Sequence, residues 1–158
     1  MVEIAPNVIV RGNKAYIPSF GKTPAGFYMS IEPVYVVNLE VQEIVGALEK
    51  LIAAGVPRIP QPTREELDRP SRDPMLRAAG VRSWKALAKG GYAYAIVWEA
   101  DGIRLVLSEH DKQGRFAPGI SRSVVFPKDT PLTNIVEAML EDVRMLSERG
   151  GTGGAERR

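Results

Sequence analysis

Apolar residues recur at two different spacings along this chain, and the change from one spacing to the other predicts its secondary structure. Over residues 39–54 and 131–148 they recur every three or four positions, the spacing of one buried face of an α-helix. Over residues 2–38 and 92–126 the apolar runs are short and are broken by Gly, Pro, Asn or Asp, which is typical of β-strands. The sequence therefore predicts two long amphipathic helices, each preceded by a set of strands.

The two predicted long helices resemble each other in sequence. "EIVGALEKLI" at 43–52 and "NIVEAMLEDV" at 134–143 share Ile, Val and Ala at positions 91 residues apart. One interpretation is a duplicated unit, with halves at about 2–56 and 92–149 that each run from strands into one helix. The alternative is chance, because an apolar helical stripe draws on the same few residue types. If the halves are true copies, we expect them to join as a pseudo-symmetric pair.

The connector between the halves, residues 57–91, differs in kind. "GVPRIPQP" should run extended, and Thr63, Asp73 and Ser83 each stand where a residue can cap a short helix. Helices of about six residues need tertiary support. The expected anchors of these helices on the sheet are Met75, Leu76, Trp84 and Leu87.

The predicted fold class is α+β, with antiparallel sheet and two long amphipathic helices in a single domain over residues 1–149. Asn38 is expected to cap the first long helix, and residues 110–119 to form a loop. Residues 150–158, "GTGGAERR" with the preceding Gly, have nothing to bury and are expected to form a flexible tail.

Composition removes several classes of protein. The 158-residue chain has no cysteine, so disulfides, thiolate zinc sites and a cysteine nucleophile are excluded. No apolar run approaches the roughly 20 residues of a membrane span, and no signal peptide is evident at the N-terminus. We therefore expect a cytoplasmic protein without a membrane, metal or cofactor requirement.

Charge is concentrated in the connector. The chain carries a net charge of +2, whereas residues 57–91 hold eight Lys and Arg against four Asp and Glu. Residues 75–91 resemble the core of a helix-turn-helix unit, and nucleic-acid binding through this connector is one hypothesis. The residues that would contact nucleic acid are Arg77, Arg82, Lys85 and Lys89. Against it, Pro74 shortens the first helix, and Lys85 stands where an apolar residue should be buried.

The single histidine, His110, lies between Glu109 and Asp111, and an imidazole beside carboxylates is a candidate general acid–base. Consecutive residues on an extended strand point in alternating directions, so these three side chains are not expected to converge. An enzyme that uses His110 and nearby carboxylates therefore remains the least favoured hypothesis.

In "YAYAIVW" the aromatic residues Tyr92, Tyr94 and Trp98 share one face of a predicted strand. They are either core or, together with Arg104, an exposed platform for a protein partner; burial of large rings favours the core. With no catalytic motif, the favoured function is a non-enzymatic macromolecule-binding protein, such as a neutralising or immunity-type inhibitor or an assembly adaptor. Its expected partner is another protein, and a homodimer is possible.

Overall fold

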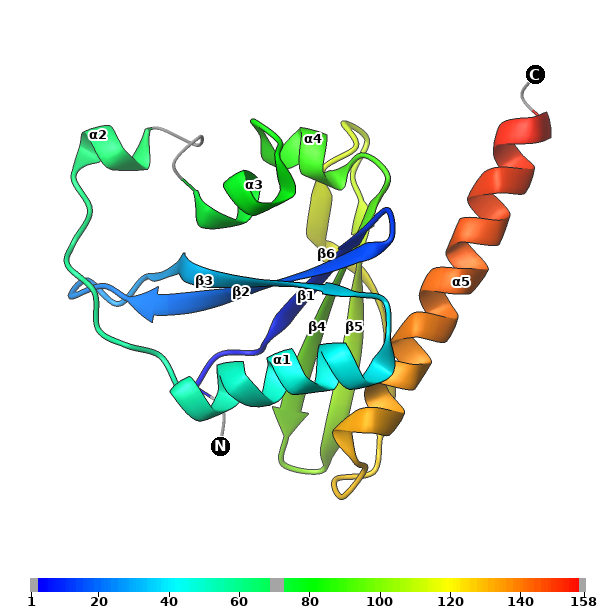
Figure 1. The fold of residues 1–158 in the computed structure, drawn as a ribbon, viewed down its shortest axis with the longest axis horizontal. Helices are drawn as coiled ribbons and strands as arrows, with labels where there is room; N and C mark the ends of the chain where they lie inside the picture. Colours follow the sequence, from blue (N-terminus) through cyan, green and yellow to red (C-terminus); the bar gives the residue numbers. More distant parts are fainter. Residues whose placement is uncertain (1–2, 69–72, 157–158) are drawn as a thin grey trace.

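A computed structural model describes residues 3–68 and 73–156, and these form six strands and five helices (Figure 1). The strands are β1 (Asn7–Arg11), β2 (Lys14–Lys22), β3 (Tyr28–Asn38), β4 (Gly91–Glu99), β5 (Gly102–His110) and β6 (Phe116–Phe126). The helices are α1 (Val41–Ala54), α2 (Arg64–Leu67), α3 (Pro74–Ala79), α4 (Trp84–Ala88) and α5 (Leu132–Glu156). The predicted α+β class and the two long helices, α1 and α5, are confirmed.

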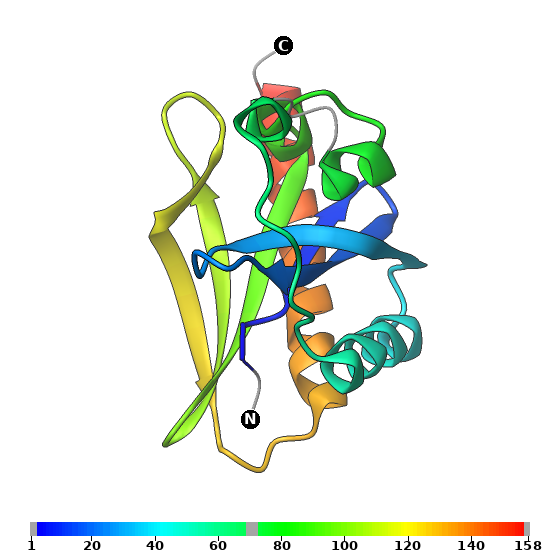
Figure 2. The same ribbon diagram turned by 90° about the vertical axis from the view of Figure 1, so that its left-hand side faces the viewer.

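All six strands form one antiparallel sheet in the order β3-β2-β1-β4-β5-β6. Figure 2 shows β2 and β3 crossing the direction of β4, β5 and β6 at a steep angle, so the sheet is strongly curled. Curling gives the sheet two different faces. We call the face that α1 and α5 cover the inner face, and the face that α3 and α4 cover the outer face.

The sheet order is symmetric about its centre. β1 and β4 are each the first strand of a half, and they pair antiparallel, with Val8 opposite Tyr94. On either side follow the second and third strands of each half, and each half ends in a long helix. In each half the pairing of the second strand with the third carries a register shift. It lies at Pro18/Ser19 between β2 and β3, and at Ser108/Glu109 between β5 and β6. The architecture of the two predicted halves is therefore repeated, with β1 and β4 at its pseudo-symmetric junction.

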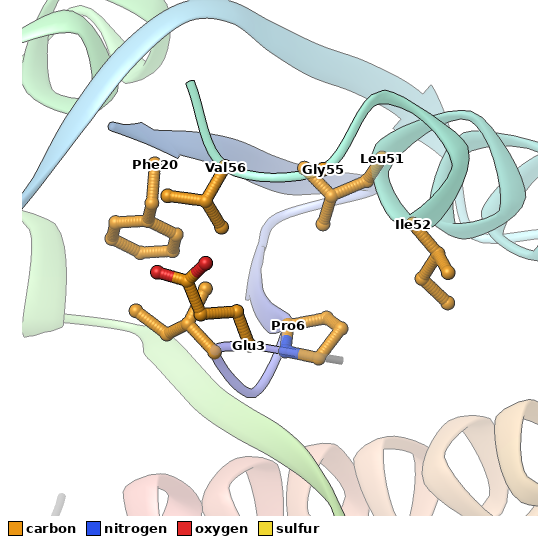
Figure 3. A pocket seen from close by; sticks show the side chains of 8 residues that line it. Glu3, Pro6, Phe20, Leu51, Ile52, Gly55 and Val56 are labelled. Carbon is orange, nitrogen blue, oxygen red and sulfur yellow. The ribbon is translucent and has the colours of Figure 1, made fainter. Parts of the chain in front are cut away.

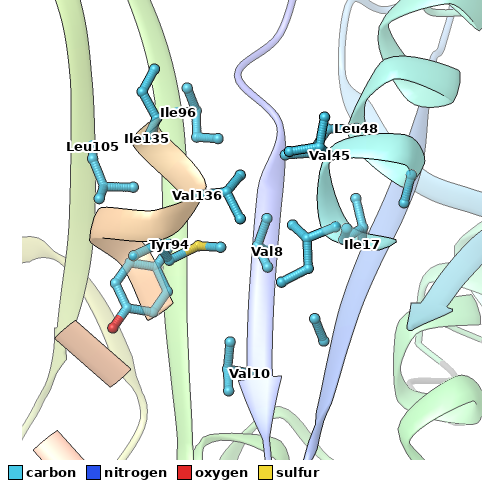
Figure 4. Packing of buried hydrophobic residues seen from close by; sticks show 14 of the residues in the cluster. Val8, Val10, Ile17, Val45, Leu48, Tyr94, Ile96, Leu105, Ile135 and Val136 are labelled. Atoms are coloured by element: carbon cyan, nitrogen blue, oxygen red, sulfur yellow. The ribbon is translucent and has the colours of Figure 1, made fainter. Parts of the chain in front are cut away.

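The main hydrophobic core lies between the inner face and the two long helices (Figure 4). The residues that match at an offset of 91 positions sit at equivalent places in it. Ile44 and Ile135, Val45 and Val136, and Leu48 and Met139 are all buried. From the sheet, Val8, Val10, Ile17, Ile96 and Leu105 pack against them. The helical stripe read from the sequence is thus the buried face of each helix.

A smaller core lies on the outer face, where α3 packs on β2 and β3 and α4 packs on β4 and β6. It consists of Ile9, Met75, Leu76 and Leu87, with partly buried neighbours that include Phe116. The short helices start as the sequence predicts: the side chains of Thr63, Asp73 and Ser83 accept hydrogen bonds from the backbone N–H groups of Glu66, Met75 and Ala86. Three of the four predicted anchors are therefore confirmed, and the fourth, Trp84, is wrong because its side chain is 43% exposed.

The connector begins by running beside the end of β2. The backbone N–H of Lys22 donates to the carbonyl of Pro57 at 2.9 Å, and the N–H of Ile59 donates to the carbonyl of Lys22 at 3.0 Å. The side chain of Ile59 covers Gly21, where an added Cβ would lie 2.6 Å from Ile59 Cγ2. The glycine at position 21 leaves the space that the side chain of Ile59 occupies.

Three boundaries differ from the sequence prediction. α1 begins after Glu40, which makes no side-chain cap, and Asn38 instead donates its backbone and side-chain N–H groups to Glu43. The expected loop at 110–119 is wrong at both ends, because His110 is the last residue of β5 and pairs with Phe116, the first residue of β6. α5 continues to Glu156, beyond the tail boundary expected at 150, since an established helix gains one backbone hydrogen bond for each residue it adds. Residues 157–158 of that tail lie outside the described residues.

Candidate functional site

The outer face carries an open groove of about 1080 Å³ between the sheet and the connector helices. We call it the outer groove. Its apolar lining comes from β1, β2, β3, β4 and β6 and from the connector, namely Ile9, Pro18, Phe20, Met29, Ile31, Pro62, Leu67, Pro74, Trp84, Ala93 and Phe116. Strands at both ends of the sheet order contribute, because the sheet curls around the groove. Such a concave, largely apolar site is the usual form of a binding site.

The groove exists because the helices over it are short. α3 and α4 have six and five residues, and the left-handed residue Gly80 ends α3. α4 buries Leu87 and Ala88 against the sheet. Trp84, the first residue of the helix, lines the groove and is 43% exposed. Leu67 on α2 is 54% exposed, and α2 buries none of its residues. Two large apolar side chains thus border the groove without being covered.

Charged groups lie around this apolar surface. A guanidinium nitrogen of Arg77 lies 3.4 Å from a carboxylate oxygen of Glu32 across the gap between α3 and β3. The carboxylate of Asp73 accepts hydrogen bonds from the hydroxyl of Ser30 at 3.1 Å and from the N–H of Met75 at 2.8 Å. Glu66 on α2 also lines the groove. The described part of the lining therefore carries three carboxylates against one guanidinium.

A second cavity of about 400 Å³ lies between the N-terminal segment, the end of α1 and β2 (Figure 3). It is lined by Glu3, Ile4, Pro6, Phe20, Leu51, Ile52, Gly55 and Val56. Its one charged group, the carboxylate of Glu3, accepts hydrogen bonds from the hydroxyl of Tyr28 at 2.9 Å and from Arg58 at 3.2 Å. The bond from Tyr28, followed by that from Arg58, holds the pKa of Glu3 below its ordinary value. Phe20 lines both this cavity and the outer groove.

The aromatic strand predicted as a possible platform is core. Tyr94 is 2% exposed, and Tyr92 and Trp98 pack against the main core as partly buried residues. The platform interpretation is wrong for Tyr94, because that ring has no surface to offer. Arg104 lies on the outer face, opposite Val97, and is ion-paired with Glu99, whose pKa this contact lowers. The four residues therefore do not form one surface.

Tyr94 instead anchors a polar cluster beneath α5. Its hydroxyl donates to Asp142 at 2.7 Å, and Arg122 on β6 donates to both oxygens of the same carboxylate at 3.2 Å. Arg122 also donates to Glu109 at 2.9 Å. Burial of the ring, together with the hydrogen bond to Asp142, raises the pKa of Tyr94 above its ordinary value. The cluster ties α5 to three strands.

The residues predicted to contact nucleic acid are divided between two surfaces. Arg77 lines the outer groove, whereas Lys85 and Lys89 line a shallow pocket of about 600 Å³ on the other side of α4. Arg82 is exposed between α3 and α4. Residues 69–72 of the connector lie outside the described residues. The structure therefore does not place the four basic side chains on one face.

His110 lines the same shallow pocket as Lys85 and Lys89. Its ring stacks on Phe116 with the ring centroids 5.5 Å apart. Its sequence neighbours have other partners, since Glu109 is paired with Arg122 and Asp111 with Arg115. The N–H of Arg115, more than any other contact, lowers the pKa of Asp111. His110, Glu109 and Asp111 therefore contact different partners and do not converge, as the alternation of side chains along a strand predicts.

Two further observations concern what the described part of the chain contains. Nowhere in it do three side chains among His, Asp and Glu gather closely enough to hold a metal ion. None of its helices combines the length and the apolar character needed to cross a membrane.

Sequence reasoning missed most of the outer groove. Its lining comes from strands and helices far apart in the chain, and no local pattern brings Phe20, Leu67 and Phe116 together. One signal was present in the sequence: Leu67 and Trp84 are large apolar residues on helices too short to bury a full stripe.

Comparison with known proteins bears on the fold alone. No protein-family model matches the chain, and no curated protein matches it. Among solved structures it is similar to "Protein of Unknown Function NMB0488 from Neisseria meningitidis", with 12% sequence identity and a TM-score of 0.54. The alignment covers 90% of this chain and 95% of that one, so the similarity extends across both halves and the connector.

Proposed function

We propose that this chain is a non-enzymatic protein that binds another protein by surface contact, and that the outer groove is its docking site. The observation that carries the proposal is the exposure of Trp84 and Leu67, at 43% and 54%, beside one apolar groove. Tryptophan is enriched among the residues that dominate binding energy at interfaces. Contiguous exposed apolar surface of this kind usually marks an interaction site.

The arrangement of the groove suits a protein partner. An apolar floor surrounded by Glu32, Glu66 and Arg77 has the pattern of an interface centre with a polar rim. A neutralising or immunity-type inhibitor and an assembly adaptor would both act through such a surface. A cysteine-free chain suits a reducing compartment, so we place the contact in the cytoplasm.

Photo-cross-linking in cells that produce the protein naturally tests the proposal. A photoreactive residue is placed at position 67 or 84 in the groove, or at 145 on α5 as the control. Met145 is similarly exposed, at 43%, but lies on the helix that covers the inner face. We expect one protein to be captured from 67 and 84 and not from 145. Capture of the same proteins from all three positions, or of none from the groove, would contradict the proposal.

Nucleic-acid binding is the second candidate, and the observation in its favour is the shared position of Lys85 and Lys89 in one pocket. Retention on heparin distinguishes it, because contacts with phosphates weaken steeply as salt rises. We expect elution below physiological salt if the groove is the functional surface. Retention well above it, lost in a Lys85→Ala and Lys89→Ala double variant, would favour nucleic acid. A second copy of the chain as the partner would appear in the cross-linking as a covalent dimer.

A further inference from the structure

The charge of the connector and the charge of the outer groove have opposite signs. Residues 57–91 carry eight basic and four acidic side chains. Among the basic residues of this segment that the structure describes, Arg77 alone lines the groove. The acidic residues Glu66 and Asp73 line it, together with Glu32 from β3. Lys85 and Lys89 are turned to the other side of α4. Among the described residues, carboxylates therefore outnumber basic groups beside the apolar groove.

The same groove has aromatic walls. Phe20, Tyr28, Trp84 and Phe116 line it, each from a different strand or helix. The face of an aromatic ring attracts cations, and carboxylates nearby add to that attraction. Tyr28 already receives such a contact within the chain, because the ammonium nitrogen of Lys22 lies 5.5 Å from the centre of its ring. Aromatic rings and carboxylates together form a surface suited to a positively charged side chain.

From this charge complementarity we propose that the outer groove takes a segment of a partner protein in which an arginine or lysine stands beside an apolar side chain. This proposal rests on the proposed function and names the chemistry of the partner. The apolar side chain fills the apolar floor of the groove, and the basic group lies beside the carboxylates of Glu32 and Glu66. Arginine fits best, since its guanidinium can stack on a ring while it donates to a carboxylate.

The alternatives fit the lining less well. Among the described lining residues, an acidic segment would meet three carboxylates and one guanidinium that is already paired with Glu32. A purely apolar segment would bury the carboxylate of Glu66 without a partner, which is unfavourable. A basic residue removes that cost and fixes the orientation of the segment.

A displayed library of random twelve-residue peptides, selected on the full chain, tests the proposal. We expect the enriched peptides to carry Arg or Lys next to an aromatic or aliphatic residue. Binding of one such synthetic peptide should weaken about tenfold in a Glu32→Gln and Glu66→Gln double variant, as expected for the loss of charge-assisted contacts at a partly exposed site. Glu49→Gln, on the exposed side of α1, removes a carboxylate far from the groove and should change affinity less than about twofold.

Three results would overturn the proposal, and they separate it from the proposed function. If enriched peptides lack basic residues, or bind the double variant as well as the native chain, but lose binding in Trp84→Ala, the groove binds protein without selecting a cation. If peptides bind Trp84→Ala and Leu67→Asp as tightly as the native chain, both the inference and the groove as docking site fail. A library that yields no binder contradicts the inference, because the native groove would then not recognise the proposed chemistry.

Discussion

The two faces of the sheet are covered in different ways. On the inner face, α1 and α5 have 14 and 25 residues, and they bury a continuous core. On the outer face, α3 and α4 have six and five residues, and the core there consists of four buried residues. At 1.5 Å per residue a five-residue helix is about 8 Å long, whereas a nine-residue strand such as β5 extends about 30 Å. Short helices cannot cover such strands, and the outer groove is the surface they leave.

This difference suggests a division of roles. The inner face holds the fold together with apolar contacts and with one polar cluster around Tyr94. The outer face contributes less burial and leaves Trp84 and Leu67 in water. Changes on the inner face should therefore alter stability, while changes around the groove should alter recognition more than folding.

The largest expected effect comes from equivalent truncations on the two faces. Leu48→Ala on α1 removes a fully buried side chain from the main core, and we expect the free energy of unfolding to fall by about 4 kcal/mol. Leu87→Ala on α4 removes an equally buried side chain, but α4 can shift toward the groove and close part of the cavity, so we expect about 2 kcal/mol.

Urea unfolding followed by circular dichroism measures both changes. Met145→Ala, at an exposed position of α5, is the control and should cost less than about 0.5 kcal/mol. Equal losses of unfolding free energy for Leu48→Ala and Leu87→Ala would show that the outer face is packed as tightly as the inner one. The proposed difference between the two faces would then be wrong.

The second effect concerns the polar cluster of the inner face. Tyr94→Phe removes the hydrogen bond to Asp142 and should lower stability by about 1.5 kcal/mol at neutral pH, the range for a bond to a charged group. The pKa of Tyr94 is raised in the folded protein, whereas in the unfolded chain it is near 10. The contribution of this proton to stability is therefore complete below about pH 10. It is lost as pH rises further, because the unfolded chain then releases a proton that the folded protein retains.

The free energy of unfolding, measured between pH 8 and pH 11, tests this predicted loss of stability at alkaline pH. The native chain should lose more stability over that interval than Tyr94→Phe does. Tyr92→Phe, on the same strand, has a ring that is only partly buried, and it should keep the full alkaline loss. If Tyr94→Phe declines as steeply as the native chain, Tyr94 does not account for the alkaline loss.

The inner face was the more predictable of the two. The stripe over α1 and α5 is long enough for its helical period to be read, and the buried residues Ile44, Val45, Ile135 and Val136 all belong to it. Alternation on β4 also predicts correctly that Tyr94 and Ile96 share a face. It does not say which face the helices cover, since Ala93 and Val97 on the other side are apolar too. The packing of α5 against Tyr94 and Ile96 determines which face of β4 is buried in the main core.

The outer face was less predictable for a physical reason. Caps such as Ser83 fix where a short helix begins, but one and a half turns do not define an apolar stripe. Trp84 and Leu87 were equally good anchors by residue type, and only the position of α4 on the sheet turns Leu87 inward and Trp84 toward the groove. The groove could not be read from the sequence because curling of the sheet brings β3 and β6 to the same site.

The smallest effect tests whether the cap of α4 holds the groove in shape. The hydroxyl of Ser83 accepts a hydrogen bond from the N–H of Ala86 at 3.0 Å, and Ser83→Ala should cost about 1 kcal/mol. We expect hydrogen exchange at Leu87, whose N–H bonds to the carbonyl of Ser83, to speed up about fivefold. Thr63→Ala removes the same kind of cap from α2, which buries no residue, so it should leave global stability within about 0.5 kcal/mol. Because Trp84 is the first residue of α4, loosening the cap should also weaken binding of the selected peptide. A Ser83→Ala chain that loses stability yet binds the peptide as tightly as the native one would show that α3 and the sheet, rather than the cap, set the position of that wall.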